Sequence, residues 1–328
     1  MINTMKDFAY LATDAIYLDS ACQSLRPQPV IDSLNEYYTA HNSCGERVKY
    51  KWGRVTDEKV EATRALVLKF LKLKSRDYFV SFTLNTTYGI NLILNQIKPQ
   101  LFKKIVTSDI EHNSPFLSTL TFAQKHQIER EVITRNDDGS IPLDEYDFDQ
   151  ALVVVNCASN IDGRKLKNLS QLVDKVHHQG GVIIIDAAQA MAHNSEILHK
   201  TKADAICFSA HKMYAPSLGV MVVRRDLLPK LETTFIGGGM VNDVDLDTFE
   251  LSSNSPDHAH TKFEAGLQAW GEIIALGEAI KWLSDISRSD WRELNENAQK
   301  LFDFLSDQPR VHLVNQEASP TSHSISMA

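Results

Sequence analysis

The sequence lacks any hydrophobic run long enough to cross a bilayer. Its longest apolar runs, such as residues 182–185, have the length of a single β-strand. Residues 1–7 contain no apolar stretch of the kind that begins a signal segment. No basic run is present either: 34 lysines and arginines face 42 acidic residues, which gives a net charge of −8. These absences argue against a membrane partner and against a nucleic-acid partner.

Cysteine is also scarce. The four cysteines (Cys22, Cys44, Cys157 and Cys207) show neither a CxxC motif nor a Cys/His spacing typical of metal ligands. We therefore predict no metal site. A reduced, cytoplasmic location is the simplest interpretation of so few cysteines without a disulfide-like spacing.

Short apolar runs alternate with helical patterns along most of the chain. Seven predicted strands lie at 78–82, 105–107, 128–133, 151–155, 181–185, 205–208 and 220–223. Several are apolar at consecutive positions, which is typical of strands covered on both faces. Helical periodicity predicts helices over 58–73 and 166–178, with Asp57 and Ser170 as candidate first residues. The pattern predicts an α/β fold with a mainly parallel sheet and helices on both faces.

The alternation of short strands and helices ends at Gly266. Two helical stretches, 268–286 and 290–305, precede candidate strands at 311–314 and 323–327. We expect an N-terminal segment over 1–19, a large domain over 20–265 and an incomplete small domain over 266–328. The last strand has no evident partner, and an unpaired strand leaves backbone groups unmatched. We therefore expect that the sequence is truncated at its C-terminus.

Polar side chains follow five of the predicted strands. They are Thr86 and Thr87, Glu111 and His112, Asn160, Asp186, and the group Ser209, His211 and Lys212. Ligands of open parallel sheets bind at the carboxyl ends of the strands. One polar residue at one strand end is ordinary, but five strands that end in this way predict a single site.

The residue types at these strand ends match the parts of one cofactor. Thr86 and Thr87 begin a helix, and hydroxyls and backbone N–H groups there suit a phosphate. A buried carboxylate such as Asp186 needs a cation, and a pyridinium nitrogen supplies one. A buried lysine such as Lys212 has a lowered pKa and can attack an aldehyde. The imidazole of His112 can stack on a flat ring. Together these features predict pyridoxal 5'-phosphate.

Several motifs carry a resemblance to a known family. They are YLDSA (17–21), NTTYGINL (85–92), EHNS (111–114), SN (159–160), DAAQA (186–190), FSAHKMYAP (208–216), GGGM (237–240) and KFEAG (262–266). In this order they resemble the class V aminotransferases of the fold type I pyridoxal-phosphate enzymes, most closely the cysteine desulfurase/selenocysteine lyase group. The resemblance implies a seven-stranded, mainly parallel sheet between helices, a partial α+β C-terminal subdomain, and a homodimer.

The resemblance also assigns roles by position. It implies that Lys212 bonds the cofactor aldehyde and that Asp186 pairs with the ring nitrogen. Gln189 would bond the ring 3-hydroxyl, His112 would stack on the ring, and Asn160 would lie near the ring and the substrate. The phosphate would be held by Thr87, Ser209 and His211, with Thr86 as an additional candidate.

The chain departs from the family pattern at several positions. Tyr88 stands where glutamate is common, and Asn113 stands where a second histidine is common. Leu267 replaces the threonine whose hydroxyl reaches the neighbouring subunit's phosphate in family dimers. The arginine that binds the substrate carboxylate and the persulfide-forming cysteine belong to the C-terminal subdomain, and neither is found before residue 328. Cys22 and Cys44 are candidate substitutes for that cysteine, although we expect each of them to be an unreactive thiol.

Three functions follow from these observations. The first is a pyridoxal-phosphate-dependent cysteine desulfurase, which converts L-cysteine to L-alanine and passes sulfur to a thiol and then to a possible sulfur-acceptor protein. The second is an aminotransferase or amino-acid epimerase of the same family. The third is a non-catalytic protein that keeps the fold.

Overall fold

The centre of the molecule is a seven-stranded sheet. The computed structural model describes residues 4–11, 16–45, 50–313 and 325–327. The strands are β1 (Tyr78–Thr83), β2 (Lys104–Ser108), β3 (Glu129–Ile133), β4 (Ala151–Asn156), β5 (Val182–Asp186), β6 (Ala205–Ser209) and β7 (Gly219–Arg224). Their order across the sheet is β1-β7-β6-β5-β4-β2-β3. Only β7 runs antiparallel to its neighbours, so the predicted mainly parallel sheet is confirmed.

Helices cover both faces of this sheet, as predicted. The helices of the described chain are α1 (Thr4–Asp7), α2 (Gln28–Ala40), α3 (Lys51–Phe70), α4 (Thr86–Gln96), α5 (Asn113–His126), α6 (Leu169–His178), α7 (Trp270–Asp285) and α8 (Arg288–Ser306). Strand β4 shows why both faces need cover, because its consecutive residues Val153 and Val154 point to opposite faces and belong to two separate hydrophobic clusters. Helices α3, α6 and α7 complete one cluster, while α4 and α5 complete the other.

Two predicted helix starts are wrong. Helix α3 begins at Lys51, so Asp57 lies inside it, because residues 51–56 contain no proline and the buried Gly53 and Thr56 continue the packed face of the helix. Helix α6 begins at Leu169 after Asn168, and Ser170 lies in its first turn. The side chain of Asn168 bonds the backbone of Ile141, which fixes where this helix begins.

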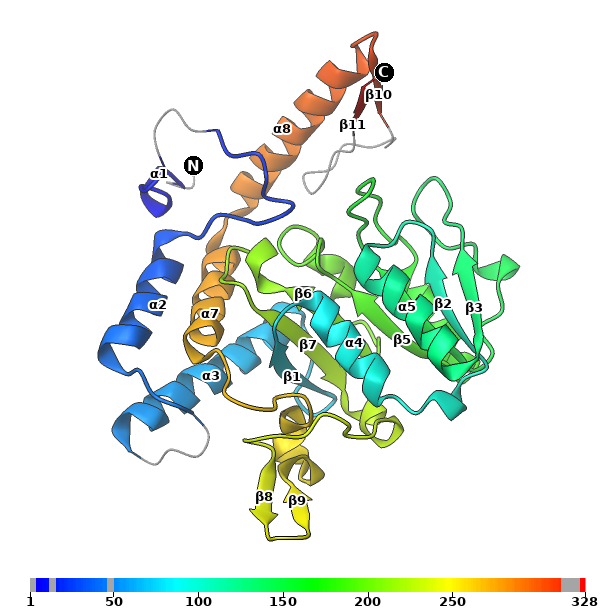
Figure 1. Ribbon diagram of the computed structural model, residues 1–328. Helices are drawn as coiled ribbons and strands as arrows, with labels where there is room; N and C mark the ends of the chain where they lie inside the picture. The colour runs from blue at the N-terminus through cyan, green and yellow to red at the C-terminus, as the bar shows by residue number, and fades with distance from the viewer. Residues whose placement is uncertain (1–3, 12–15, 46–49, 314–324, 328) are drawn as a thin grey trace.

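The C-terminal part contains the two predicted helices. Helix α7 packs against α2 and α3, whereas α8 extends away from the sheet (Figure 1). Strands β10 (Val311–Leu313) and β11 (Ile325–Met327) pair with each other in antiparallel fashion, so the last strand does have a partner, contrary to the expectation. Residues 323 and 324 of that predicted strand lie outside the described residues. The predicted domain boundaries remain predictions.

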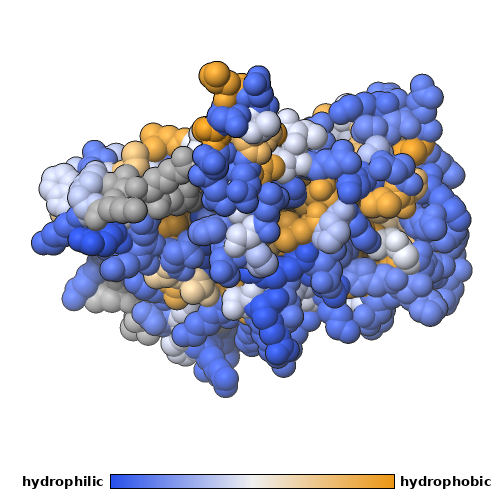
Figure 2. Space-filling model, turned by 90° about the horizontal axis from the view of Figure 1, so that it is seen from below, coloured by the Kyte–Doolittle hydropathy of each residue, from blue (hydrophilic) through white to orange (hydrophobic). Residues whose placement is uncertain are grey.

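A small hairpin was not predicted from the sequence. Strands β8 (Val241–Val244) and β9 (Phe249–Leu251) form it and project from the body (Figure 1). On the face seen from below, hydrophilic residues dominate and hydrophobic ones form separate patches (Figure 2). Within the described residues, no helix combines the length and the apolar character needed to traverse a bilayer.

Candidate functional site

A cavity of about 300 Å³ lies at the carboxyl ends of the parallel strands. Its walls contain all nine residues predicted for the site: Thr86, Thr87, His112, Asn160, Asp186, Gln189, Ser209, His211 and Lys212. They come from the ends of β1, β2, β4, β5 and β6. Register places Asp186 at the end of β5 directly beside Cys207 of β6, so Asp186 and Lys212 approach the cavity from neighbouring strand ends. The predicted convergence of five strand ends therefore holds in the structure.

Lys212 ends the short 3-10 helix η4 (Ala210–Lys212), which follows β6 directly. Burial lowers the pKa of its amine, against the opposing effects of Asp186 and Cys22. An amine with a lowered pKa is more often unprotonated, which is the form that attacks a carbonyl carbon.

Ser24 and Arg26, which precede helix α2, hold the loop around Lys212 in place. The Ser24 hydroxyl donates to the His211 carbonyl at 2.8 Å and accepts from the Tyr214 backbone N–H at 2.7 Å. Arg26 Nε donates to the Ala215 carbonyl at 3.1 Å. These bonds join residues almost 190 positions apart and fix the backbone on both sides of Lys212, and Cys22, two residues before Ser24, lines the cavity.

Asp186 is a buried carboxylate with 3% of its surface exposed. Its Oδ1 accepts the Ala188 backbone N–H at 2.9 Å. Within the described part of the chain, no cation lies at ion-pair distance from this carboxylate. Burial raises its pKa to about 6, although the Ala188 bond and the charge of Lys212 act in the opposite direction. The site therefore contains a carboxylate whose ionised form needs a positive partner.

His112 is the N-cap residue of α5, and this role fixes its ring. Its Nδ1 accepts the Ser114 backbone N–H at 3.0 Å, so in the neutral ring the proton is on Nε2. Burial lowers the pKa of the imidazole, and the charge of Lys212 lowers it further. The ring is thus neutral near pH 7 and is presented to the cavity by a capped helix.

The start of α4 forms the hydroxyl-rich wall of the cavity. The Asn85 side chain caps this helix by accepting the Tyr88 N–H at 2.9 Å. The Thr86 backbone N–H donates to the Ser209 hydroxyl at 2.9 Å, and the two hydroxyls lie 2.7 Å apart. The Thr87 hydroxyl lies 2.5 Å from that of Ser114. Hydroxyls gathered at a helix N-terminus favour an anion such as phosphate.

Gly219, at the start of β7, permits this arrangement. A Cβ atom at this position would lie 2.3 Å from Thr83 Oγ1 and 2.4 Å from the Asn85 nitrogen. Any side chain would therefore push the N-terminus of α4 away from β7. Close packing between β7 and the start of α4 therefore requires glycine at this position.

A buried charge network supports the cavity from behind. Arg135 and Glu111 form an ion pair at 2.9 Å, and both side chains are fully buried. Arg135 also donates to the Asn156 carbonyl at 2.7 Å, and Glu111 accepts the Asn156 backbone N–H at 2.7 Å. Burial raises the pKa of Glu111 to about 7, while Arg135 opposes this rise. The network fixes the end of β4 and the loop that carries His112.

The residues present fit pyridoxal phosphate. Asn156 lines the cavity, and its side-chain oxygen is buried and has no hydrogen-bond partner among the described residues. Asp186 lacks a cation, and a pyridinium nitrogen would supply both a positive charge and a proton donor. The hydroxyls of Thr86, Thr87 and Ser209 offer donors to a phosphate. The cavity volume also lies at the lower end of the range for small-molecule sites.

Sequence reasoning missed other residues of the cavity wall. They are Cys22, Asn85, Ser114, Asn156, Ala158 and Ala188. Cys22 directly follows the YLDSA motif and is predicted only as a candidate substitute for the persulfide-forming cysteine, while Ser114 is the last residue of the EHNS motif. Nothing in the sequence marks Asn156, which is only the last residue of an apolar strand. Gln189 donates from Nε2 to the Ala21 carbonyl at 3.0 Å, and Asn160 is exposed at the rim.

Comparison with known proteins gives consistent results. The profile of the family described as Aminotransferase class-V matches residues 16–328. A probable cysteine desulfurase from Pyrococcus abyssi is 31% identical over 284 residues, which covers 84% of this chain and 69% of the relative. A probable cysteine desulfurase from Ureaplasma parvum is 30% identical over 328 residues, which covers 94% and 77%. The apo structure of a cysteine desulfurase from Thermococcus onnurineus NA1 is 28% identical, with a TM-score of 0.83, over 99% of this chain and 81% of that one.

Proposed function

Because the chain belongs to the class V aminotransferase family, we propose that it acts on L-cysteine as a pyridoxal-phosphate-dependent desulfurase. The products are L-alanine and a sulfur atom carried on a thiol. The observation that carries the proposal is the convergence of Lys212, Asp186 and His112 on one cavity in a chain whose relatives are named cysteine desulfurases.

Each residue has a physical role in this proposal. Pyridoxal phosphate, when bound, supplies an aldehyde for the substrate amine and a ring that withdraws electrons from the substrate. Lys212 would hold the aldehyde group, and its amine would move a proton at the substrate Cα, which its lowered pKa favours. Asp186 would keep a proton on the ring nitrogen, and the neutral ring of His112 would lie against the cofactor ring. The phosphate would be held by Thr86, Thr87, Ser209 and His211, the ring hydroxyl by Gln189, and Asn160 would lie by the substrate.

The reaction also needs a thiol that accepts sulfur. Among the described cysteines, burial strongly raises the pKa of the Cys157 and Cys207 thiols, which makes both poor nucleophiles. Cys22 and Cys44 are exposed, and Cys22 lines the cavity. In this proposal the sulfur then passes from the thiol to a separate sulfur-acceptor protein.

We expect a homodimer in the cytoplasm. Large apolar side chains are exposed on and near the β8–β9 hairpin: Phe235, Val244, Leu246, Phe249 and Leu267. Leu246 is fully exposed and Leu267 is 78% exposed. Exposed apolar side chains that gather in one region are typical of an interaction surface. Light scattering after size exclusion should give twice the mass of the chain for the wild type, and a smaller mass for Leu246→Asp.

The proposed reaction is tested by its two products. The purified protein, loaded with pyridoxal phosphate, is incubated with L-cysteine and a thiol reductant, and alanine and sulfide are measured. We expect equal amounts of both from the wild type and neither from Lys212→Ala. Formation of a keto acid without sulfide would favour the aminotransferase alternative, and racemised cysteine would favour an epimerase.

A further inference from the structure

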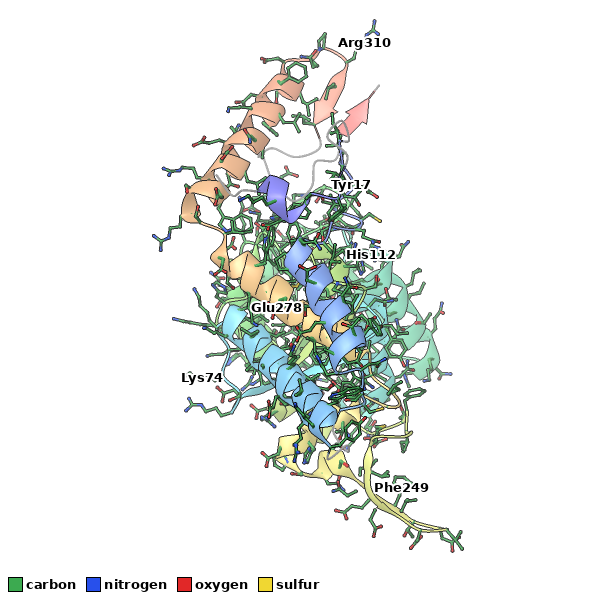
Figure 3. The ribbon with its side chains drawn as sticks, turned by 90° about the vertical axis from the view of Figure 1, so that its left-hand side faces the viewer. Tyr17, Lys74, His112, Phe249, Glu278 and Arg310 are labelled. Carbon is green, nitrogen blue, oxygen red and sulfur yellow. The ribbon has the colours of Figure 1, made fainter. Side chains whose placement is uncertain are left out.

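A second cavity, of about 580 Å³, lies at the other end of the sheet. Three segments form its walls: residues 72–78 between α3 and β1, residues 200–202 before β6, and residues 224–226 after β7. Strand β6 runs from Ala205 to Ser209, so residues 200–202 precede it while Lys212 follows it. Figure 3 labels Lys74 and His112 on opposite sides of the view. We call this second cavity the basic cavity.

The basic cavity carries a large excess of positive charge. Its walls contain seven basic residues (Lys72, Lys74, Arg76, Lys200, Lys202, Arg224 and Arg225) and two acidic ones (Asp77 and Asp226). The difference of seven and two is an excess of five positive charges. The whole chain carries a net charge of −8, so this concentration runs against the overall charge.

The two acidic residues do not neutralise the lysines. Asp226 pairs with Arg224 at 2.7 Å, and Asp77 lies 3.5 Å from Arg76. Over the described residues, none of the four lysines of the basic cavity has a carboxylate within ion-pair distance. The pKa of the neighbouring His199 is lowered, first by burial and next by the charge of Lys72. The four lysines of the basic cavity are therefore not ion-paired with any carboxylate of the described residues.

Hydrogen bonds tie the three walls together. The Tyr78 hydroxyl donates to the Thr201 carbonyl at 3.0 Å. The Arg225 backbone N–H donates to the Asp77 carbonyl at 2.9 Å, and its Nε donates to the Ser75 carbonyl at 3.0 Å. Tyr78 itself is only 5% exposed. The backbone beneath the lysines is therefore fixed, and the positive charges share a preformed hollow.

We propose that the basic cavity binds a small polyanion that bears two or more phosphate groups, such as pyrophosphate or a nucleoside polyphosphate. Lysine ammonium groups are strong phosphate binders, and several around one hollow favour several negative charges on one ligand. The cavity volume lies in the range of small-molecule sites. We do not propose a nucleic acid as the ligand, because the phosphate backbone of a nucleic acid needs an extended basic surface and the chain as a whole has a net charge of −8.

Binding of pyrophosphate to the cofactor-loaded protein tests the proposal. Calorimetry at low salt uses wild type, the double variant Lys74→Gln/Lys202→Gln, and the control Lys103→Gln. Lys103 is a surface lysine that pairs with Asp149 away from the cavity. Cofactor loading occupies the phosphate-binding wall of the first cavity, so added pyrophosphate reports on the second.

We expect pyrophosphate to bind wild type and Lys103→Gln with equal affinity and to bind the double variant about tenfold more weakly or worse. The absorbance of the bound cofactor should be the same in all three proteins, which separates this test from that of the proposed function. Undetectable binding to wild type, or equal binding to wild type and the double variant, would overturn the proposal. So would an acidic peptide such as oligoglutamate that binds more tightly than pyrophosphate or ATP.

Discussion

Asp186→Asn should stabilise the cofactor-free protein, although it should weaken cofactor binding. Without a ring nitrogen, the carboxylate is buried, and its pKa is raised to about 6 because burial disfavours its charge. In the unfolded chain an aspartate has a pKa of about 3.9. The difference of about two units at about 1.4 kcal/mol each predicts that the ionised side chain costs the fold about 3 kcal/mol above pH 6. Asparagine removes this charge and can still accept the Ala188 N–H.

The sign of the pH dependence follows from the raised pKa. Below about pH 4 the carboxyl is protonated in both states, so the cost is absent. As pH rises from about 4 to 6, the unfolded state ionises first, and the wild type loses stability relative to the variant. The gain of Asp186→Asn should thus be full at pH 8 and should vanish near pH 4.

Urea unfolding of the cofactor-stripped proteins measures this effect. With a slope of roughly 3 kcal/mol per molar urea, a gain of about 3 kcal/mol raises the midpoint by about 1 M at pH 8. The matched control is Asp204→Asn, since Asp204 is also buried but accepts the Ile183 N–H and pairs with His177 at 2.8 Å. That control should lose stability. A midpoint for Asp186→Asn at or below that of the wild type at pH 8 would refute the reasoning.

Three further predictions follow from the packing of the site. Glu264→Gln should cost about 3–5 kcal/mol of unfolding free energy, because it leaves the buried Arg64 without the charged partner that lies 2.7 Å from it. Glu61→Gln alters a 64% exposed partner of the same arginine and should cost less than about 1 kcal/mol. Equal urea midpoints for the two variants would contradict this prediction. Gly219→Ala should weaken cofactor binding without removing any side chain of the site, since its Cβ would strike the start of α4; a cofactor dissociation constant equal to that of the wild type would count against it. Alkylation of Cys22 by iodoacetamide should slow when pyridoxal phosphate fills the cavity, while Cys44 should react at an unchanged rate. Peptide mass spectrometry measures both rates. Equal protection of the two thiols would contradict the placement of Cys22 in the cavity wall.

The sheet and its site could be predicted because the signals were local. Continuous apolar runs define buried strands such as β4 and β5, and a polar residue directly after a strand marks its end, as at Asp186. The start of α3 was missed because Asp57 looks like a cap, although the helix continues through six residues before it. The β8–β9 hairpin was missed because its exposed strands bury no face, so the sequence shows no alternation there.

Contacts between segments that are distant in the sequence could not be predicted from local sequence patterns. Cys22 reaches the cavity only because Ser24 and Arg26 dock on the backbone around Lys212. The Arg64–Glu264 pair joins residues 200 positions apart. The basic cavity likewise combines three segments whose charges are unremarkable in each one alone.

The most direct test of the central claim is the visible absorbance of the purified protein after it is loaded with pyridoxal phosphate and dialysed. If Lys212 holds the cofactor aldehyde in the same cavity as Asp186, the wild type and Lys103→Ala will keep the absorbance of lysine-bound pyridoxal phosphate, and Lys212→Ala will lose it. The same lysine-bound absorbance in Lys212→Ala and in the wild type would contradict the account.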